Sequence, residues 1–153
     1  MAKRFTVPLI AQDSSDTCWH ASAMMIWQYS QGQTSRQGPM NTLAPDYNAN
    51  RPIGPSAFTR LAEKVGMRPV PGSIGSVTET DIESWLTMYG PLWCAGYWYG
   101  SGHVIVLTGV DDKNVYLNDP DGGVPKQGSI AWFNLKLAKD VLGPVMYKDP
   151  SAY

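Results

Sequence analysis

Three side chains that lie far apart along the chain could together perform nucleophilic catalysis, and the first is the thiol of Cys18. Residues 14–17 (SSDT) are of the types that cap helix N-termini, and residues 18–29 are typical of a helix. A thiol at the start of a helix faces unpaired backbone N–H groups and the positive end of the helix dipole. Both stabilise the thiolate, which is the form that attacks carbonyl groups. We therefore expect Cys18 to be a nucleophile.

A histidine and an aspartate from two later strands supply the groups that such a nucleophile needs. His103 follows a Gly-Ser-Gly tripeptide and opens an apolar strand, and Asp119 ends the next strand. The imidazole can move protons while a carboxylate holds it in one tautomer. Asn118 is the alternative partner of the imidazole, but neighbours in a strand face opposite sides, and the spacing favours Asp119. Gln12, six residues before Cys18, offers an amide to a developing oxyanion.

The remaining cysteine is assigned to the core, and the remaining histidine a structural role or a place at the rim of the site, where its position beside Trp19 could let it contact substrate. Cys94 lies inside an apolar strand, and free cysteines are among the most buried residues. His20 lies two positions after Cys18, which is about 200° around a helix, so its side chain leaves the other face. That geometry argues against a zinc site built from these two residues with His103 and Asp119. We predict no metal site and no cofactor.

Composition places the chain among soluble globular proteins. Its 153 residues are 43% hydrophobic and 16% charged, a composition that excludes a disordered chain. The net charge is −1, so the protein has no basic field that would attract nucleic acid. No apolar run approaches the ~20 residues of a membrane span, and no signal peptide is evident. We expect a soluble protein, cytoplasmic or delivered by a specialised secretion system, whose two cysteines form no disulfide framework.

The apolar pattern predicts a single domain over residues 1–153, with a helical half at about 14–90 and a stranded half at about 91–148. The third helix should be capped by Thr78 or Thr80, with Thr80 and Glu83 forming a capping box. A long polar loop at 31–55 is a candidate wall of a binding cleft. Helices are expected at 18–29, 56–65 and 79–89, strands at 92–99, 103–110, 115–117, 129–133 and 145–147, and a helical turn at 135–141.

In order and spacing, these motifs resemble those of papain-like cysteine peptidases. Gln12 precedes Cys18 by six residues, Trp19 and a helix rich in small residues follow, and Asn-Asp-Pro lies sixteen residues beyond the glycine-preceded His103. The chain is most similar to a compact bacterial branch, which comprises peptidases that cut after double-glycine leaders and effector proteases of plant pathogens. The resemblance covers about residues 5–147. It implies an α+β fold in which a helical half carrying the cysteine helix packs on an antiparallel sheet.

The same resemblance assigns a role to each candidate residue. It implies that Cys18 is the nucleophile, His103 the general base and then acid, Asp119 the orienting residue and Gln12 the oxyanion donor. Only 85 residues separate Cys18 from His103, fewer than the ~130–150 of plant-type papain. This short separation favours the compact branch and leaves little room for a large second lobe.

The function implied is a cysteine endopeptidase that cuts a protein or peptide with small residues, such as glycine, near the cut. Trp19, Trp98 and Gly102 are weaker candidates for contacts with that substrate. The favoured setting is a bacterial effector or toxin protease with a cognate inhibitor (immunity) protein in the producing cell. One alternative is a peptidoglycan amidase or endopeptidase of the related CHAP-like class, which shares the cysteine helix and the Gly-His-Val strand. The other is an inactive binding module with the same fold.

Overall fold

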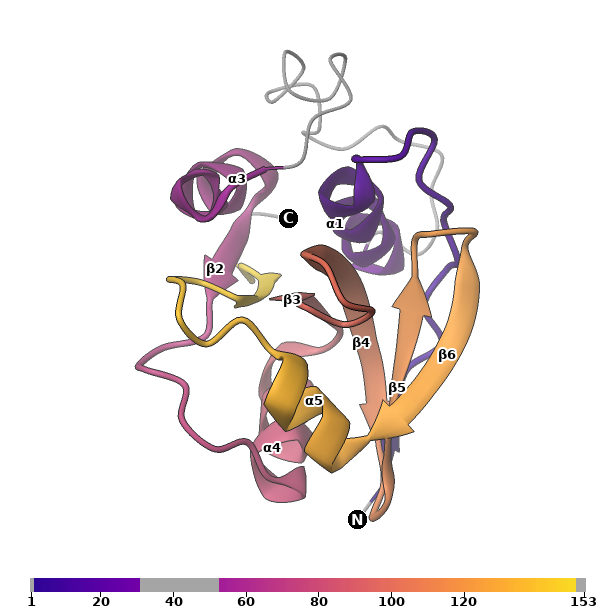
Figure 1. Cartoon of the computed structure of the whole chain (residues 1–153), viewed down its shortest axis with the longest axis vertical. Coiled ribbons are helices and arrows are strands. Elements are labelled where there is room, and N and C mark those ends of the chain that lie inside the picture. Colours follow the sequence, from indigo (N-terminus) through magenta and orange to yellow (C-terminus); the bar gives the residue numbers. More distant parts are fainter. Residues whose placement is uncertain (1, 31–52, 151–153) are drawn as a thin grey trace.

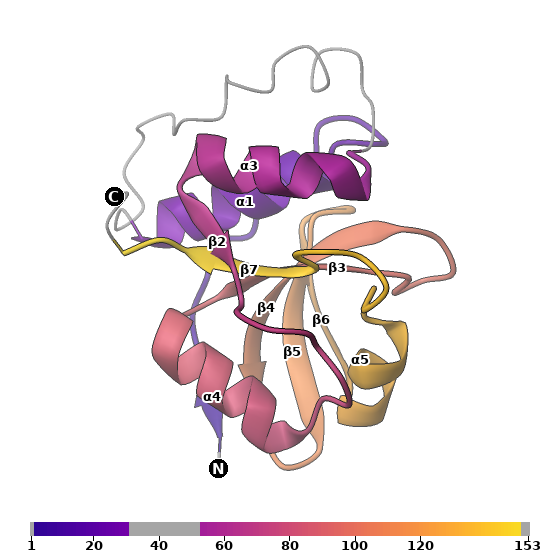
Figure 2. The ribbon, with the colours of Figure 1, turned by 90° about the vertical axis from the view of Figure 1, so that its left-hand side faces the viewer.

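The computed structural model describes residues 2–30 and 53–150, which form an antiparallel sheet with helices on both faces (Figures 1 and 2). Within these residues the strands follow the order β2-β7-β3-β4-β5-β6, and β1 pairs with β4 beside this path. The strands are β1 (Lys3–Arg4), β2 (Met67–Pro69), β3 (Leu92–Gly96), β4 (His103–Val110), β5 (Asn114–Asp119), β6 (Val124–Ser129) and β7 (Val145–Lys148). The helices are α1 (Cys18–Ser30), α3 (Phe58–Val65), α4 (Glu79–Tyr89) and α5 (Ile130–Lys136), with a 3₁₀ turn, η2 (Pro55–Ala57), before α3.

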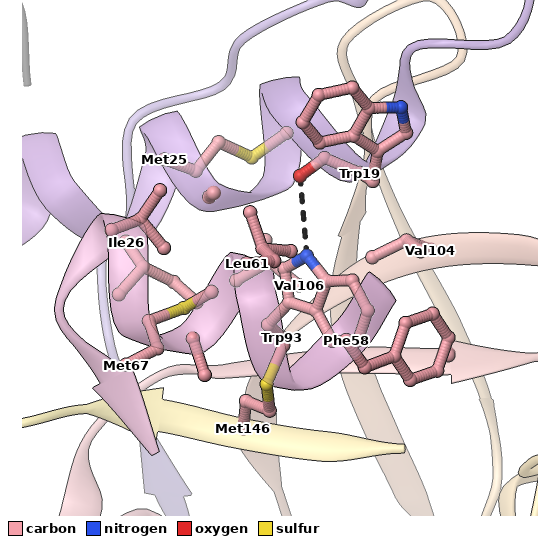
Figure 3. Packing of buried hydrophobic residues seen from close by; sticks show 14 of the residues in the cluster. Trp19, Met25, Ile26, Phe58, Leu61, Met67, Trp93, Val104, Val106 and Met146 are labelled. Atoms are coloured by element: carbon pink, nitrogen blue, oxygen red, sulfur yellow. Dashed lines mark hydrogen bonds between the residues drawn. The ribbon is translucent and has the colours of Figure 1, made fainter. Parts of the chain in front are cut away.

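The two central strands β3 and β4 are buried on both faces, because alternate residues of each strand enter different cores. Trp93 and Ala95 of β3 belong to the core that the sheet shares with α1 and α3 (Figure 3). Leu92 and Cys94 belong to the opposite core, which contains apolar residues of α4 and α5. Figure 2 shows the two helix pairs on opposite sides of the sheet.

Two buried hydrogen bonds fix α1 against the sheet. Trp93 Nε1 donates to the carbonyl oxygen of Trp19 at 3.2 Å (Figure 3), and Ser22 Oγ donates to the carbonyl oxygen of Val104 at 3.3 Å. Trp93 also packs edge-to-face on Phe58 of α3, with ring centroids 5.0 Å apart. The first turn of α1 is therefore held in place relative to β3 and to the beginning of β4.

Several predicted elements are confirmed. α1 begins at Cys18, and both α4 and β4 have the predicted bounds. α3 ends at Gly66, whose φ of 70° is the left-handed conformation that glycine adopts readily. The second helix was expected from residue 56, but η2 occupies its first turn.

The details of two connections differ from expectation. The capping box of α4 is formed by Thr78 and Asp81, not by Thr80 and Glu83: the Thr78 hydroxyl accepts from the Asp81 N–H, and the Asp81 carboxylate accepts from the Thr78 N–H. β3 ends at Gly96 instead of continuing to residue 99, because the chain turns between residues 97 and 100. A helical turn was predicted at 135–141, but its first two residues form the end of α5. The next residue, Leu137, forms an isolated bridge with Gly96 of β3.

The strand predicted at 129–133 is wrong, because most of this segment forms α5. Ser129 caps the helix, its hydroxyl accepting from the Trp132 N–H at 2.9 Å, and Phe133 is the residue that α5 buries. The missed strand lies just before it, as β6. β6 contains Pro125, whose missing N–H is tolerated because β6 lies at an edge of the sheet.

Most of the predicted polar loop, residues 31–52, lies outside the described residues. Among residues 2–30 and 53–150, no helix has the length and apolar character needed to cross a bilayer.

Candidate active site

The register of the sheet brings His103 and Asp119 together at the end of the β4–β5 pair. Val106 of β4 pairs with Asn118 of β5, so Asp119 lies diagonally across from His103 on one face of the sheet. His103 Nε2 and Asp119 Oδ1 are 2.6 Å apart. The two side chains are 16% and 1% exposed, so the contact is largely shielded from water.

The His103 ring also interacts with Cys18, the first residue of α1. Burial alone would lower the pKa of His103, but the hydrogen bonds with Asp119 and Cys18, together with the negative charges of both, raise it to about 9. Because Nε2 faces Asp119, Nδ1 is the ring nitrogen left for the thiol. An imidazole in this environment is protonated at neutral pH, which is the state that pairs with a thiolate.

Asp119 is held by three donors from three segments of the chain. Burial would raise the pKa of Asp119, but hydrogen bonds from His103, from Lys126 and from the backbone N–H of Asp121 lower it to about 2. Lys126 Nζ lies 2.6 Å from Oδ2, and the Asp121 N–H donates to Oδ1 at 3.0 Å. The sequence analysis missed Lys126, because it expected no strand at residues 124–128 and the position of this lysine depends on the pairing of β5 with β6.

Asn118, the alternative partner of the imidazole, faces the other side of β5. Its Nδ2 donates to the carbonyl oxygen of Val7 at 3.1 Å, and the side chain is buried there. This bond anchors the segment that leads to α1. Of the two neighbouring residues, Asp119 is therefore the one that the structure brings to His103.

Gln12 lies beside the site, but its amide group is turned toward its own loop. Its backbone N–H donates to the carbonyl oxygen of Pro120 at 2.7 Å, which holds the segment before α1 against the turn that follows β5 (Figure 1). Nε2 donates to the carbonyl oxygens of Ser14 and Ser15, at 2.9 and 2.8 Å. Oε1 is buried without a partner among the described residues. The amide must therefore turn before it can donate to an oxyanion at Cys18.

Two cavities meet at Cys18 and His103, and Gly102 lines both of them. The first has a volume of about 210 Å³ and is mainly apolar. The second has a volume of about 420 Å³ and is more polar. The first is lined also by Trp19, Ile53, Phe58, Ala95, Gly96, Tyr97, Val104, Ala138 and Val141, and the second by Gln12, Ser15, Asp16, Tyr99, Ser101 and Asp121.

The predicted substrate contacts do not all lie at these cavities. Gly102 and Trp19 do, although Trp19 is only 1% exposed. Trp98 lies in the core that contains α4 and α5 instead, where its Nε1 donates to the carbonyl oxygen of Cys94 at 3.3 Å and its ring stacks on Phe133. At 2% exposure its indole has almost no surface to offer a peptide.

The other cysteine and histidine lie apart from the cavities. Cys94 is fully buried, as predicted, and burial raises the pKa of its thiol. His20 lines neither cavity and packs edge-to-face on Trp19, with ring centroids 5.6 Å apart. In the part of the chain that the structure describes, no group of three or more metal-ligating side chains is placed to hold an ion.

Comparisons with known proteins identify the family and the fold of the chain. The family model described as "Papain-like cysteine protease AvrRpt2" matches residues 1–138. A double glycine motif protease from an AMS/PCAT transporter, solved with its leader peptide, has a similar structure with a TM-score of 0.58 at 19% identity, over 95% of this chain and 92% of that one. A structure concerning the mite allergens Blo t 1 and Der p 1 gives a TM-score of 0.52 at 12% identity, over 92% of this chain and 66% of that one.

No curated protein sequence matches the chain. At these identities the two solved structures establish the fold, which is mixed helix and antiparallel sheet of the papain type. The family match covers most of the chain and extends through the segments that carry Cys18, His103 and Asp119. The chain therefore belongs to the AvrRpt2 family of papain-like cysteine proteases and is a cysteine peptidase.

Proposed function

We propose that Cys18, His103 and Asp119 are the catalytic triad with which this peptidase cuts protein or peptide chains. The observation that carries the proposal is the position of the His103 ring, which contacts Asp119 at 2.6 Å through Nε2 and shares a hydrogen bond with Cys18. A nucleophile, a base and an orienting group in contact, in that order, are what nucleophilic attack on a carbonyl requires.

In the proposed reaction, His103 Nδ1 takes the proton of Cys18, and the thiolate sulfur attacks the scissile carbonyl carbon. When the tetrahedral intermediate collapses, the C–N bond breaks and His103 gives its proton to the leaving amine. A water molecule deprotonated by His103 then attacks the thioester, which releases the acid and restores the thiol. Asp119 stays ionised throughout and stabilises the imidazolium.

The oxyanion of the intermediate would lie at the start of α1. The backbone N–H of Cys18 belongs to the first turn of the helix, where N–H groups have no intrahelical acceptor. Gln12 is the proposed second donor, after its amide turns away from the carbonyl oxygens of Ser14 and Ser15. The loss of those two hydrogen bonds would be offset by the charge-assisted bond to the oxyanion.

The two cavities suggest how a peptide is held. The apolar cavity, at about 210 Å³, is smaller than the ~300–1,000 Å³ sites that enclose whole small ligands, so it suits a single apolar side chain. Gly102 lies between the cavities and leaves room for the substrate backbone. A protease of similar fold is named for a double-glycine motif, and by this analogy we propose glycine or another small residue beside the cut.

The name of the matched family, AvrRpt2, suggests an effector protease, and we propose that role for this chain. An effector that acts on competing bacteria would require an inhibitor protein in the cell that produces it, and that partner is part of the proposal. Such an inhibitor would be expected to cover the cavities at Cys18 and His103.

The test compares new protein N-termini in cells that express the wild type, Cys18→Ala or Gly102→Leu. A Cβ at Gly102 meets no atom within 4 Å, so the leucine should fill the cleft without disturbing the fold. We expect new N-termini in cells that express the wild type or the control Cys94→Ala. Cells that express Cys18→Ala or Gly102→Leu should lack them. New N-termini shared with Cys18→Ala would contradict the proposed nucleophile, and release of muropeptides from purified cell walls would favour the amidase instead.

A further inference from the structure

We propose that Lys126 is a positioning residue of the active site, which holds the Asp119 carboxylate in the orientation that pairs with His103. The proposal rests on the triad proposed above. It adds a fourth side chain, one that would act on the thiol only through Asp119 and His103.

The two oxygens of Asp119 have different partners. Oδ1 accepts from His103 Nε2 at 2.6 Å and from the Asp121 N–H at 3.0 Å. Oδ2 accepts from Lys126 Nζ at 2.6 Å, and within the described residues it has no other partner. Asp119 is only 1% exposed, so water has little access to replace a lost donor. Without Lys126, the carboxylate is free to rotate toward other donors, since one of its oxygens is unpaired.

The sheet and one aromatic ring fix the lysine itself. Lys126 pairs with Leu117, so it lies diagonally across from Asp119 on the same face of β5 and β6. Its ammonium nitrogen lies 4.3 Å from the ring centroid of Tyr99, a cation–π contact, and that ring lies 6.2 Å from the ring of His103. Tyr99 and Lys126 thus flank the His103–Asp119 pair on its solvent side, and the lysine side chain keeps 38% exposure.

Two effects of the lysine charge oppose each other. As a cation beside Asp119, Lys126 weakens the attraction of the carboxylate for the imidazolium. As a donor to Oδ2, it keeps Oδ1 aimed at His103. Since Asp119 is buried and Oδ2 has this single partner, we infer that orientation outweighs charge. Removing Lys126 should therefore lower the fraction of the thiolate–imidazolium pair, whereas a pure charge effect would raise it.

The test is the rate at which iodoacetamide alkylates Cys18, measured from about pH 6 to about pH 10. We expect Lys126→Met and Lys126→Gln to slow alkylation about tenfold at the acid end, the size expected for one charge-assisted hydrogen bond. The difference should vanish at the alkaline end, because the imidazolium through which Lys126 would act is lost as the pH rises through about 9. Lys126→Arg should stay close to the wild type. Lys113→Met, in the turn at the opposite end of β4 and β5, is the matched control.

A double-mutant cycle shows whether the lysine acts through Asp119. In an Asp119→Asn background, Lys126→Met should have no further effect on the acid-end rate. Three results would each overturn the proposal. The alkylation rate could be unchanged or faster in both Lys126→Met and Lys126→Gln, the loss of rate could be equal at every pH, or the effects of Lys126→Met and Asp119→Asn on the rate could be fully additive. Alkylation needs no substrate, so this result stands apart from whether the protein cuts peptides, which the comparison with Cys18→Ala decides.

Discussion

Protonation of His103 sets the pH range in which the proposed triad can work. The pKa of this imidazole is raised to about 9, against the effect of burial, by the hydrogen bonds with Asp119 and Cys18. Because the folded pKa lies above the ordinary value, the imidazolium persists through neutral pH and is lost as the pH rises through about 9. The alkaline limit of activity should therefore lie unusually high for a histidine.

Asp119→Asn should move this limit to lower pH. The substitution removes the negative charge and the strongest acceptor of the imidazolium, while the burial that lowers the pKa of His103 remains. The pH dependence of kcat/KM measures the limit, and titration of the His103 ring by NMR gives the pKa directly. Asp121→Asn is the control, because Asp121 serves Asp119 through its backbone N–H. An unshifted limit in Asp119→Asn would show that the carboxylate does not govern the imidazole.

Gln12→Ala separates oxyanion stabilisation from loop structure. If the amide donates to the oxyanion, the variant should lose about 10²-fold in kcat, as for other single donors of this kind. Alkylation of Cys18 by iodoacetamide forms no oxyanion, so its rate should stay within about twofold of the wild type. An equal loss in both assays would mean that Gln12 matters through its bonds to Ser14 and Ser15, which shape the segment before α1.

The positions of these residues could be predicted from local patterns, and their contacts only in part. Cap residues indicate a helix start at Cys18, and strand alternation separates Asp119 from Asn118, as the structure confirms. Lys126 could not be found in this way, since its place depends on pairing between β5 and β6. The inward turn of the Gln12 amide depends on carbonyl oxygens of its own loop, which no sequence pattern reports.

At the level of elements, the distance between thiol and imidazole depends on how α1 sits on the sheet. Trp93 of β3 binds the carbonyl oxygen of Trp19, the residue next to Cys18, and Ser22 binds the strand residue that follows His103. The first bond holds α1 at the residue next to Cys18, and the second ties α1 to β4 at the residue next to His103. Small movements of α1 would therefore change the contact between sulfur and ring directly.

Trp93→Phe tests this anchoring. The phenyl ring keeps most of the packing against Phe58 but loses the hydrogen bond from the indole Nε1 to the Trp19 carbonyl oxygen. The loss of one hydrogen bond costs about 0.5–1.5 kcal/mol, and the smaller ring also leaves a cavity, so the free energy of unfolding from urea titration should fall by at least about 1 kcal/mol. We also expect slower alkylation of Cys18, since α1 is less firmly placed. Trp85→Phe, in α4 on the far side of the sheet, should leave the alkylation rate unchanged.

The elements that sequence analysis placed well are those whose pattern is local. α4 has caps at both ends, and β4 is a continuous apolar run preceded by glycines. The prediction for residues 124–136 was wrong, because the mixture of apolar and polar residues there is compatible with a strand as well as with a helix. There, pairing of an exposed edge strand and burial of Phe133 decide the outcome, and both are tertiary effects.

For the molecule as a whole, the sheet is shared by two cores. β3, β4 and β7 each contribute to both: β4, for example, places Val104 and Val106 on the α1 side and Ile105 and Leu107 on the α4 side. Opening either core would expose one face of these strands. Loss of one core should therefore destabilise the other, and the helical and stranded parts are expected to unfold together as one domain.

Cys94 provides a probe of that prediction. It is fully buried in the core that lacks α1, and it is the single thiol left in Cys18→Ala. In a urea titration of this variant, reaction of Cys94 with a thiol reagent should follow the same transition as far-UV circular dichroism, which reports on the helices that cover both cores. A thiol that becomes reactive at clearly lower urea would show that the α4 side opens independently. The prediction of a single cooperative domain would then be wrong, and the β4–β5 end that carries His103 and Asp119 would depend on the α1 core alone.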